Sequence, residues 1–170
     1  MQMFKIGKDI SSFSTRSCKP ISRDELRRII NQRISKEGKT CNLNDIDTSL
    51  ITDMSYLFYG LEFNGNISDW DVSNVTDMSY MFYDSGFNGD ISRWDLEKAK
   101  NLQSMFERSK FNSDISRWKM PNVRNMSYMF CASDFNQDIS RWMIDKTRCN
   151  IFLIFSRSSI KEEHKPNSLR

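Results

Sequence analysis

The sequence repeats itself with a period of 24 residues, and this repetition constrains the fold more than any other feature. The segment "FNGNISDW" begins at Phe63, and close copies begin at Phe87, Phe111 and Phe135, each 24 residues after the one before. Phe, Asn, Ile, Ser and Trp keep their places in all four copies. One unit of this size cannot bury its own aromatic side chains, so neighbouring units have to stack and share a continuous core.

The other half of each unit repeats as well. The segment "ITDMSYLF" at residues 51–58 returns in altered form at residues 75–82, 99–106 and 123–130. We therefore predict a tandem array over residues 41–142, with four units that contain both halves and a further half-unit that ends at Trp142.

The apolar pattern within a unit predicts two short elements. In "WDV" at residues 70–72, apolar and polar residues alternate, which is typical of a half-buried strand. The spacing of Val75, Met78, Met81 and Phe82 places them along one face of a short helix. Stacking such units predicts an α/β repeat solenoid, in which short parallel strands and short helices stack in a right-handed sense.

The residues that every unit keeps are predicted to be structural. We expect the asparagines to satisfy backbone groups in a tight turn, with the serines in a weaker version of that role, and the tryptophans to stack in the core. The asparagines are Asn64, Asn88, Asn112 and Asn136, the tryptophans are Trp70, Trp94, Trp118 and Trp142, and the serines are Ser68, Ser92, Ser116 and Ser140. Identical groups on every unit serve architecture, so we do not expect them to be catalytic.

The segments that flank the array are expected to cover its apolar ends. A capping helix is predicted within residues 21–40, because Ser22 and Glu25 form a capping box and Gly38 is a C-terminal stop. Ile21 and Leu26 are expected to form a hydrophobic staple. The arginines of this helix either contact the acidic first units or form a solvated face. The remaining segments are predicted to be a loose region at residues 1–20, a degenerate last unit or C-terminal cap at residues 143–155, and a disordered tail at residues 156–170.

The charges are segregated along the chain, although the net charge is only +3. Residues 41–86 contain eight acidic residues and no Lys or Arg. The basic excess lies outside the repeats, so we expect no nucleic-acid partner, which would require clustered cations on one face.

Motifs for targeting, disulfides and metals are missing from the sequence. No apolar run is long enough to span a membrane, and residues 1–20 carry no recognisable secretory signal, which predicts a cytoplasmic location. The cysteines do not follow the repeat and show no paired spacing, so free thiols are expected rather than disulfides or a metal site, and no cofactor is expected. These cysteines are Cys18, Cys41, Cys131 and Cys149.

The combined pattern "FNxDISxWDVSNVTDMSYMF" resembles the BspA-like leucine-rich repeats, an atypical class with a period of 24 residues. The resemblance extends over residues 24–142 and includes a leader before the array. It implies a leucine-rich-repeat-like solenoid without catalytic residues, which binds proteins and is in several cases attached to bacterial cell surfaces. By this resemblance the location would be the cell surface or the exterior rather than the cytoplasm.

Residues on either side of each tryptophan vary from unit to unit, and this variation suggests a recognition face for a protein partner. The candidate residues of this face are Asp47, Asp71, Ser73, Asp95, Glu97, Lys119, Arg93, Arg117 and Arg141. The acidic row of Asp47, Asp71 and Asp95 suggests a basic patch on the partner. Neutral drift of solvated residues explains the variation at any one of these positions equally well.

Two other functions compete with binding of a protein. An enzyme is disfavoured, because the single histidine, His164, lies in the polar tail and no motif for a nucleophile or a phosphate loop is present. Calcium binding is an alternative, since oxygen ligands recur on successive units. The candidate ligands are Asn66, Asp90, Asp114 and Asp138.

Overall fold

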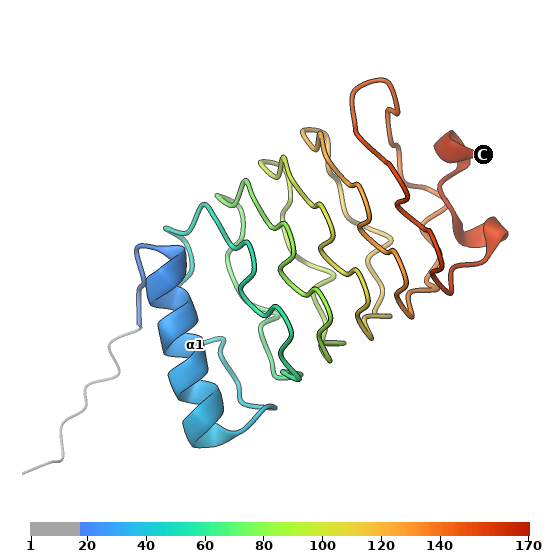
Figure 1. Ribbon diagram of the computed structural model, residues 1–170. Coiled ribbons are helices and arrows are strands. Elements are labelled where there is room, and N and C mark those ends of the chain that lie inside the picture. Colours follow the sequence, from blue (N-terminus) through green and yellow to red (C-terminus); the bar gives the residue numbers. More distant parts are fainter. Residues whose placement is uncertain (1–17) are drawn as a thin grey trace, which may run out of the picture.

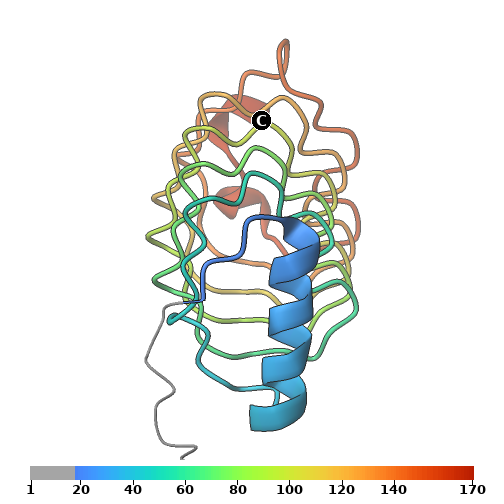
Figure 2. The same cartoon turned by 90° about the vertical axis from the view of Figure 1, so that its left-hand side faces the viewer.

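The computed structural model describes residues 18–170, which form a stack of successive loops with a single α-helix at its N-terminal end (Figure 1). The helix α1 spans Arg23–Glu37, and two 3-10 turns, η1 at Glu162–His164 and η2 at Asn167–Leu169, lie at the C-terminal end. We call each loop of the stack a rung. The five rungs begin at Leu43, Ile67, Ile91, Ile115 and Ile139. Viewed along the stack, the rungs superpose around a common interior, and α1 crosses the near end (Figure 2).

The predicted α/β architecture is wrong, and so is the leucine-rich-repeat architecture that the resemblance implied. Within residues 18–170, α1 is the one α-helix, and parallel pairing is limited to isolated bridges, so no sheet forms. One row of bridges runs the length of the stack, through Asp53, Asp77, Asn101, Asn125 and Asn150.

The segment that we predicted as a short helix is a chain of tight turns. The N–H groups of Met78, Tyr80 and Phe82 donate to carbonyl oxygens of the next rung, over distances of 2.9 Å each. The N–H of Met81 instead donates to the carbonyl of Met78 three residues earlier (3.2 Å). Alternate backbone groups therefore point out of the rung, which leaves them unable to form the i to i−4 bonds of an α-helix.

These turns use a backbone conformation that most residues avoid. The φ angle of Tyr80 is 57° at the third position of the turn from Met78 to Met81, as type II geometry requires. Two rows of residues share a positive φ, namely Tyr56, Tyr80, Ser104, Tyr128 and Leu153 in the first and Gly60, Asp84, Arg108, Ala132 and Arg157 in the second. Left-handed residues cost about 1–2 kcal/mol each when they are not glycine, so the bonds between rungs must hold them in place.

The predicted strand has the expected burial but not the expected pairing. Trp70 and Val72 are buried and Asp71 between them is exposed, as alternation requires. The segment is flanked by turns, however, because the N–H of Trp70 donates to Ile67 (3.2 Å) and the N–H of Val75 donates to Val72 (2.9 Å). Two of its backbone groups are committed to these turns, and no bridge joins the segment to the neighbouring rungs.

Two columns of phenylalanine rings form the core. The first consists of Phe58, Phe82, Phe106, Phe130 and Phe155, whose successive ring centroids lie 5.3–5.9 Å apart. The second consists of Phe63, Phe87, Phe111 and Phe135, with centroids 6.2 Å apart. The columns also contact each other, at 4.1 Å between Phe106 and Phe111. Stacked aromatic pairs contribute about 0.5–1.5 kcal/mol each beyond the burial of their area.

The repeated tryptophans and asparagines connect neighbouring rungs. The indole N–H of each tryptophan donates to a carbonyl oxygen of the preceding rung, for example Trp118 to Ile91 at 3.0 Å and Trp70 to Leu43 at 2.9 Å. The first three asparagine side chains each accept a bond from the backbone N–H of the next asparagine, as Asn88 does from Asn112 (2.7 Å), and Asn136 accepts from the N–H of Lys161 (3.0 Å). The remaining members of these ladders are Asn64, Asn136, Trp94 and Trp142.

Helix α1 covers the first rung. Its Leu26 and Ile30 are fully buried in the common core, and its N-cap Ser22 accepts a bond from the N–H of Glu25 (3.3 Å). The predicted hydrophobic staple is wrong, because Ile21 is 75% exposed. The carboxylate of Glu25 accepts a bond from the backbone N–H of Ile21 (3.0 Å), so this N–H group, just before the helix, has a hydrogen-bond partner.

Two arginines of α1 contact the acidic first rung. Arg33 forms an ion pair with Asp45 (2.8 Å), and Arg23 lies 3.5 Å from Asp53. Arg27 and Arg28 are exposed on the outer face of the helix.

The C-terminal end departs from the 24-residue period. Asn125 pairs with Asn150, so the last rung contains one extra residue. The predicted disorder of residues 156–170 is not observed, because the bonding between rungs continues into this segment. The N–H of Ala132 donates to Ser156 (2.8 Å), and Ile160 is buried. The predicted loose segment at residues 1–20 lies mostly outside the described residues.

The columns of phenylalanines predict that a central ring matters more than a terminal one. We expect Phe106→Ala to lower the free energy of unfolding by about 3–5 kcal/mol, because this ring is fully buried between two neighbours. Phe155→Ala should cost about 1–2 kcal/mol, since that ring is partly exposed at the end of the column. Urea denaturation measures both, and equal losses would contradict the dependence of the core on stacking.

Candidate functional site

The predicted recognition face lies along the outer surface of the stack. Its charge changes sign from one end of the stack to the other. Asp71, Asp95 and Lys119 occupy equivalent places in rungs 2, 3 and 4, and all three are exposed. The exposed row on the other side of the tryptophans is Arg93, Arg117 and Arg141. Asp47 forms an ion pair with Lys19 (2.8 Å), so it is less available to a partner. Ser73 is half-buried and donates its hydroxyl hydrogen to Asp71 (2.7 Å).

A pocket with a volume of about 780 Å³ opens at the end of this face where the period breaks. It lies between rungs 4 and 5, with Glu97 of rung 3 at its edge. The extra residue of the last rung falls between Trp142 and Asn150, so this loop does not superpose on the one before it. Rungs 4 and 5 differ in length here, so their side chains do not fill the space between them. In the regular part of the stack the equivalent space is filled by side chains.

The interior of the pocket is apolar. Trp118 and Trp142 stack with ring centroids 6.4 Å apart, and both are almost fully buried. Met126 and Ile144 also line the interior and are buried. Met143 is 91% exposed at the mouth, an unusual place for a large apolar side chain. An apolar group of a ligand could therefore contact the flexible side chain of Met143.

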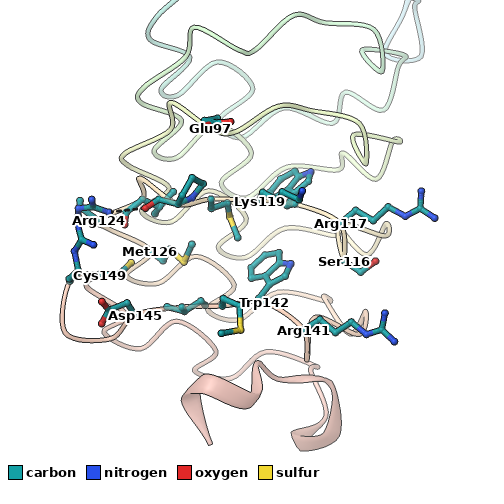
Figure 3. Close-up of a pocket in the computed structure, with 17 residues that line it drawn as sticks. Glu97, Ser116, Arg117, Lys119, Arg124, Met126, Arg141, Trp142, Asp145 and Cys149 are labelled. Atoms are coloured by element: carbon teal, nitrogen blue, oxygen red, sulfur yellow. Dashed lines mark hydrogen bonds between the residues drawn. The ribbon is translucent and has the colours of Figure 1, made fainter.

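The rim of the pocket is cationic. Its basic residues are Arg117, Lys119, Arg124, Arg141 and Arg148, against the two acids Glu97 and Asp145. Within residues 18–170, none of these five cations lies in an ion pair. Figure 3 shows Arg117 and Arg141 extending in the same direction on one side of the pocket, with Arg124, Asp145 and Cys149 on the other side.

Four of the predicted face residues line this pocket. Glu97, Arg117, Lys119 and Arg141 were among the predicted face residues, and the pocket brings them together. Three of the lining residues that the sequence pattern did not single out are Met120, Arg124 and Arg148. The one-residue shift in register after Trp142 was the available signal, because a loop that is longer than its neighbours cannot pack as they do.

The pocket contains a thiol but no histidine. Burial raises the pKa of Cys149, so its thiol stays protonated at neutral pH. The side chain of His164 lies elsewhere, with Nδ1 2.8 Å from the carbonyl oxygen of Asn136 at the end of the asparagine ladder. This arrangement can bind an apolar group and an anion, and its lining includes no thiol–histidine pair.

The candidate calcium ligands close local turns. The side chain of Asp90 accepts a bond from the N–H of Ser92 (2.9 Å), and Asp114 and Asp138 do the same at 2.8 and 2.9 Å. Asn66 accepts the equivalent bond with its amide oxygen (3.1 Å). Within residues 18–170, no group of three or more His, Cys, Asp or Glu side chains is placed to hold a metal ion.

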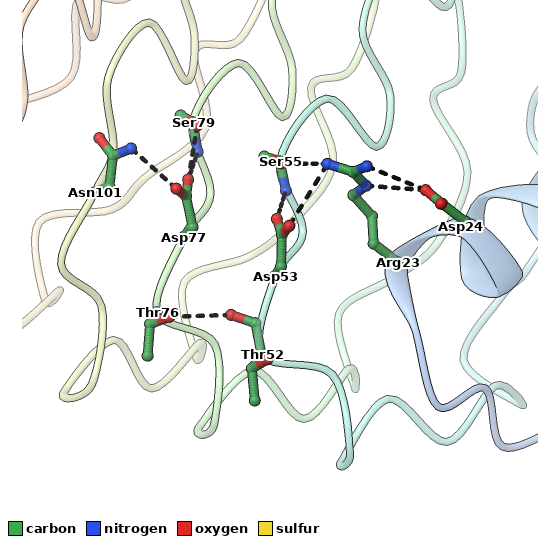
Figure 4. Close-up of polar contacts among 9 residues, drawn as sticks. All are labelled: Arg23, Asp24, Thr52, Asp53, Ser55, Thr76, Asp77, Ser79 and Asn101. Carbon is green, nitrogen blue, oxygen red and sulfur yellow. Dashed lines mark hydrogen bonds and ion pairs between the residues drawn. The ribbon is translucent and has the colours of Figure 1, made fainter.

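A second row of the same turns begins beside α1 and continues along the stack (Figure 4). Asp77 accepts bonds from the N–H of Ser79 (2.8 Å) and from the side-chain amide of Asn101 (3.1 Å). On the first rung, Arg23 donates to the hydroxyl of Ser55 (3.0 Å). Asp53 on rung 1 and Asp77 on rung 2 therefore both close structural turns.

These turns predict a loss of stability in acid. Backbone and hydroxyl donors of the serine two residues on lower the pKa of Asp90, Asp114 and Asp138, and a bond from Lys19 lowers that of Asp47 to about 2. A carboxylate whose folded pKa lies below the unfolded value of about 3.9 stabilises the fold above that pH, and its contribution is lost as the pH falls through the folded pKa.

We expect the unfolding free energy to fall as the pH is lowered below about 4, and to fall less steeply in the triple variant Asp90→Asn, Asp114→Asn, Asp138→Asn. At neutral pH the variant should retain its stability, because Asn66 already closes the same turn with an amide. Urea denaturation across the pH range measures this. A calcium-dependent melting temperature that disappears in the variant would show instead that these residues bind the ion.

Comparison with known proteins places most of this chain in one family. Residues 25–142 and 84–164 match the family described as "Mycoplasma protein of unknown function, DUF285". No curated protein and no solved structure gives a significant match. Within residues 18–170, no helix is long and apolar enough to cross a membrane. Because the two overlapping matches together cover residues 25–164, which include most of the capping helix and all five rungs, the chain belongs to the DUF285 family.

Proposed function

We propose that this protein is a non-catalytic protein-binding module, whose pocket between rungs 4 and 5 holds an apolar side chain from an acidic segment of a partner. The observation that carries this proposal is the combination of an apolar interior with five rim cations that have no ion-pair partner within residues 18–170. Unpaired cations around an apolar space match a ligand that is apolar in one part and anionic in another.

The two parts of the pocket contribute differently to binding. Burying one large apolar side chain contributes about 1.5–3 kcal/mol, and Met143 at the mouth is free to adjust to its shape. The rim cations Arg117 and Arg141 are exposed, so they contribute through steering and specificity rather than through strong individual contacts. We therefore expect moderate affinity and a clear dependence on salt.

A peptide suits this pocket better than a nucleic acid. Single-stranded nucleic acids are held by aromatic side chains whose faces are open to stack on bases. Trp118 and Trp142 are only 5% and 3% exposed and stack on each other, so no ring face is presented.

The acidic part of the face extends the same binding mode. Asp71 and Asp95 lie in the row that leads to Lys119, and neither forms an ion pair within the described residues. A partner that runs along this row would place a basic group over these aspartates and its acidic segment at the pocket. The resemblance to BspA-like repeats suggests that such a partner is a host or cell-surface protein, and this suggestion remains a prediction.

Charge reversal at the pocket tests the proposal. The probe is a fluorescein-labelled synthetic peptide in which one tryptophan is flanked on each side by two aspartates. We expect Arg117→Glu with Arg141→Glu to weaken binding at least tenfold, or about 1.4 kcal/mol, as measured by fluorescence anisotropy at low salt. Arg93→Glu is the matched control, because Arg93 has the same place on rung 3 but does not line the pocket.

Removing the apolar contact provides a second arm. Met143→Ser should also weaken the peptide complex while leaving the fold intact, since this side chain is almost fully exposed. The proposal is wrong if the Arg93→Glu control loses as much affinity as the double variant. It is also wrong if a single-stranded oligonucleotide binds more tightly than the peptide through the same arginines.

A further inference from the structure

Four tyrosines form an ordered patch on rungs 1 and 2, at the opposite end of the stack from the pocket. Tyr56 stacks on Tyr80 and Tyr59 stacks on Tyr83, each with ring centroids 4.8 Å apart and with interplanar angles of 8° and 3°. The two stacks also touch each other, at 5.7 Å between Tyr56 and Tyr59 and 5.9 Å between Tyr80 and Tyr83. We call these four residues the tyrosine quartet.

The tyrosine quartet is both exposed and fixed in place. Tyr56 and Tyr59 are 40% and 42% exposed, which is high for rings that are packed on their neighbours. Their backbone is held by bonds to the next rung, such as that from the N–H of Tyr56 to Ser79 (3.0 Å). Rigid tyrosines lose little conformational entropy on binding, which is one reason why they dominate recognition surfaces.

The surroundings of the quartet are acidic. The carboxylates of Asp77, Asp84 and Glu107 lie close enough to raise the pKa values of Tyr56 or Tyr83, in addition to the larger effect of burial. Two arginines, Arg23 and Arg108, lie nearby, and each is already close to an aspartate, Asp53 and Asp84 respectively (3.5 and 3.7 Å). Residues 41–86 contain no Lys or Arg, so the area has an excess of negative charge.

We propose that the tyrosine quartet is a second recognition surface, which takes an arginine-rich or lysine-rich segment of a partner protein. Arginine stems would lie against the tyrosine rings, and the guanidinium groups would meet both the ring electrons and the flanking carboxylates. This surface is independent of the proposed pocket. The pocket takes anionic groups at rungs 4 and 5, whereas the quartet takes cationic groups at rungs 1 and 2.

The equivalent position on rung 4 supplies a matched control. Tyr128 has the same positive φ as Tyr56 and Tyr80, but its ring packs edge-on against Phe152 and it has no tyrosine beside it. Asparagine tolerates this conformation, so Tyr56→Asn and Tyr128→Asn are comparable changes.

The experiment uses the full chain and a fluorescein-labelled decapeptide of alternating arginine and glycine. Anisotropy at low salt should show binding, and Tyr56→Asn with Tyr59→Ser should weaken it at least about tenfold. Tyr128→Asn should change the affinity by less than about twofold. Asp84→Asn, a change that also suits the local φ of 50°, should weaken binding and reduce its dependence on salt.

Several results would overturn the proposal. The Tyr56→Asn, Tyr59→Ser variant could bind the arginine peptide as well as the unchanged protein, or no binding could be measurable at millimolar peptide. Sedimentation velocity that shows self-association through the quartet would replace the basic partner with a second copy of the chain. Because Arg117→Glu with Arg141→Glu should leave arginine-peptide binding undiminished, failure here is distinguishable from failure of the pocket.

Discussion

Hydrogen bonds between the backbones of neighbouring rungs are the interaction on which the rest of this structure depends. In rung 2 the N–H groups of Met78, Tyr80, Phe82 and Asp84 all donate to rung 3. These bonds hold the rungs close to the spacing of paired strands, about 4.8 Å. The stacking distances of the phenylalanines and tyrosines follow from this spacing. The bonds also offset the cost of placing non-glycine residues at positive φ on every rung.

A stack of this kind requires rungs of equal length, and its candidate pocket lies where that requirement is relaxed. Each rung up to the fourth returns to the same place after 24 residues, so its side chains fill the space above the rung before. The last rung pairs Asn150 with Asn125 and therefore contains 25 residues. Its loop cannot reproduce the packing below it, and Met143 is left exposed beside an open apolar space. One inserted residue thus converts a structural repeat into a candidate site.

The sequence predicted which residues face inward better than it predicted the backbone that carries them. Val75, Met78, Met81 and Phe82 are all fully buried, as the pattern indicated. A spacing of three, however, fits a chain of tight turns as well as one face of a helix, and a single unit does not reveal where its N–H groups point. Those groups bond to the next rung, so the competition between helix and turns is decided by stacking, which local periodicity does not contain.

The candidate surfaces were predictable in part for a similar reason. Arg117, Lys119 and Arg141 were predicted as face residues because the positions beside the tryptophans are not constant from unit to unit, and all three line the pocket. Arg124 and Arg148 could not be assigned to the same site without the geometry of the longer rung. The tyrosine quartet was not among the predicted sites. Its rings form one patch because the turns place Tyr56 beside Tyr59 and the stacking of rungs places Tyr80 and Tyr83 next to them.

The N-terminal segment determines which charges of the array remain available to partners. Lys19, Arg23 and Arg33 lie against Asp47, Asp53 and Asp45, which are all acids of the first rung. The free acidic surface therefore begins on rung 2, at Asp71 and around the tyrosines. At the other end, the residues from 156 onward continue the backbone bonding but bring no carboxylate into an ion pair with the pocket cations. The N-terminal segment pairs with the acids of the first rung, whereas the described C-terminal residues leave the pocket cations without an ion pair. The acidic surface that begins on rung 2 and the cationic pocket largely cancel each other in the net charge of the chain, which is only +3.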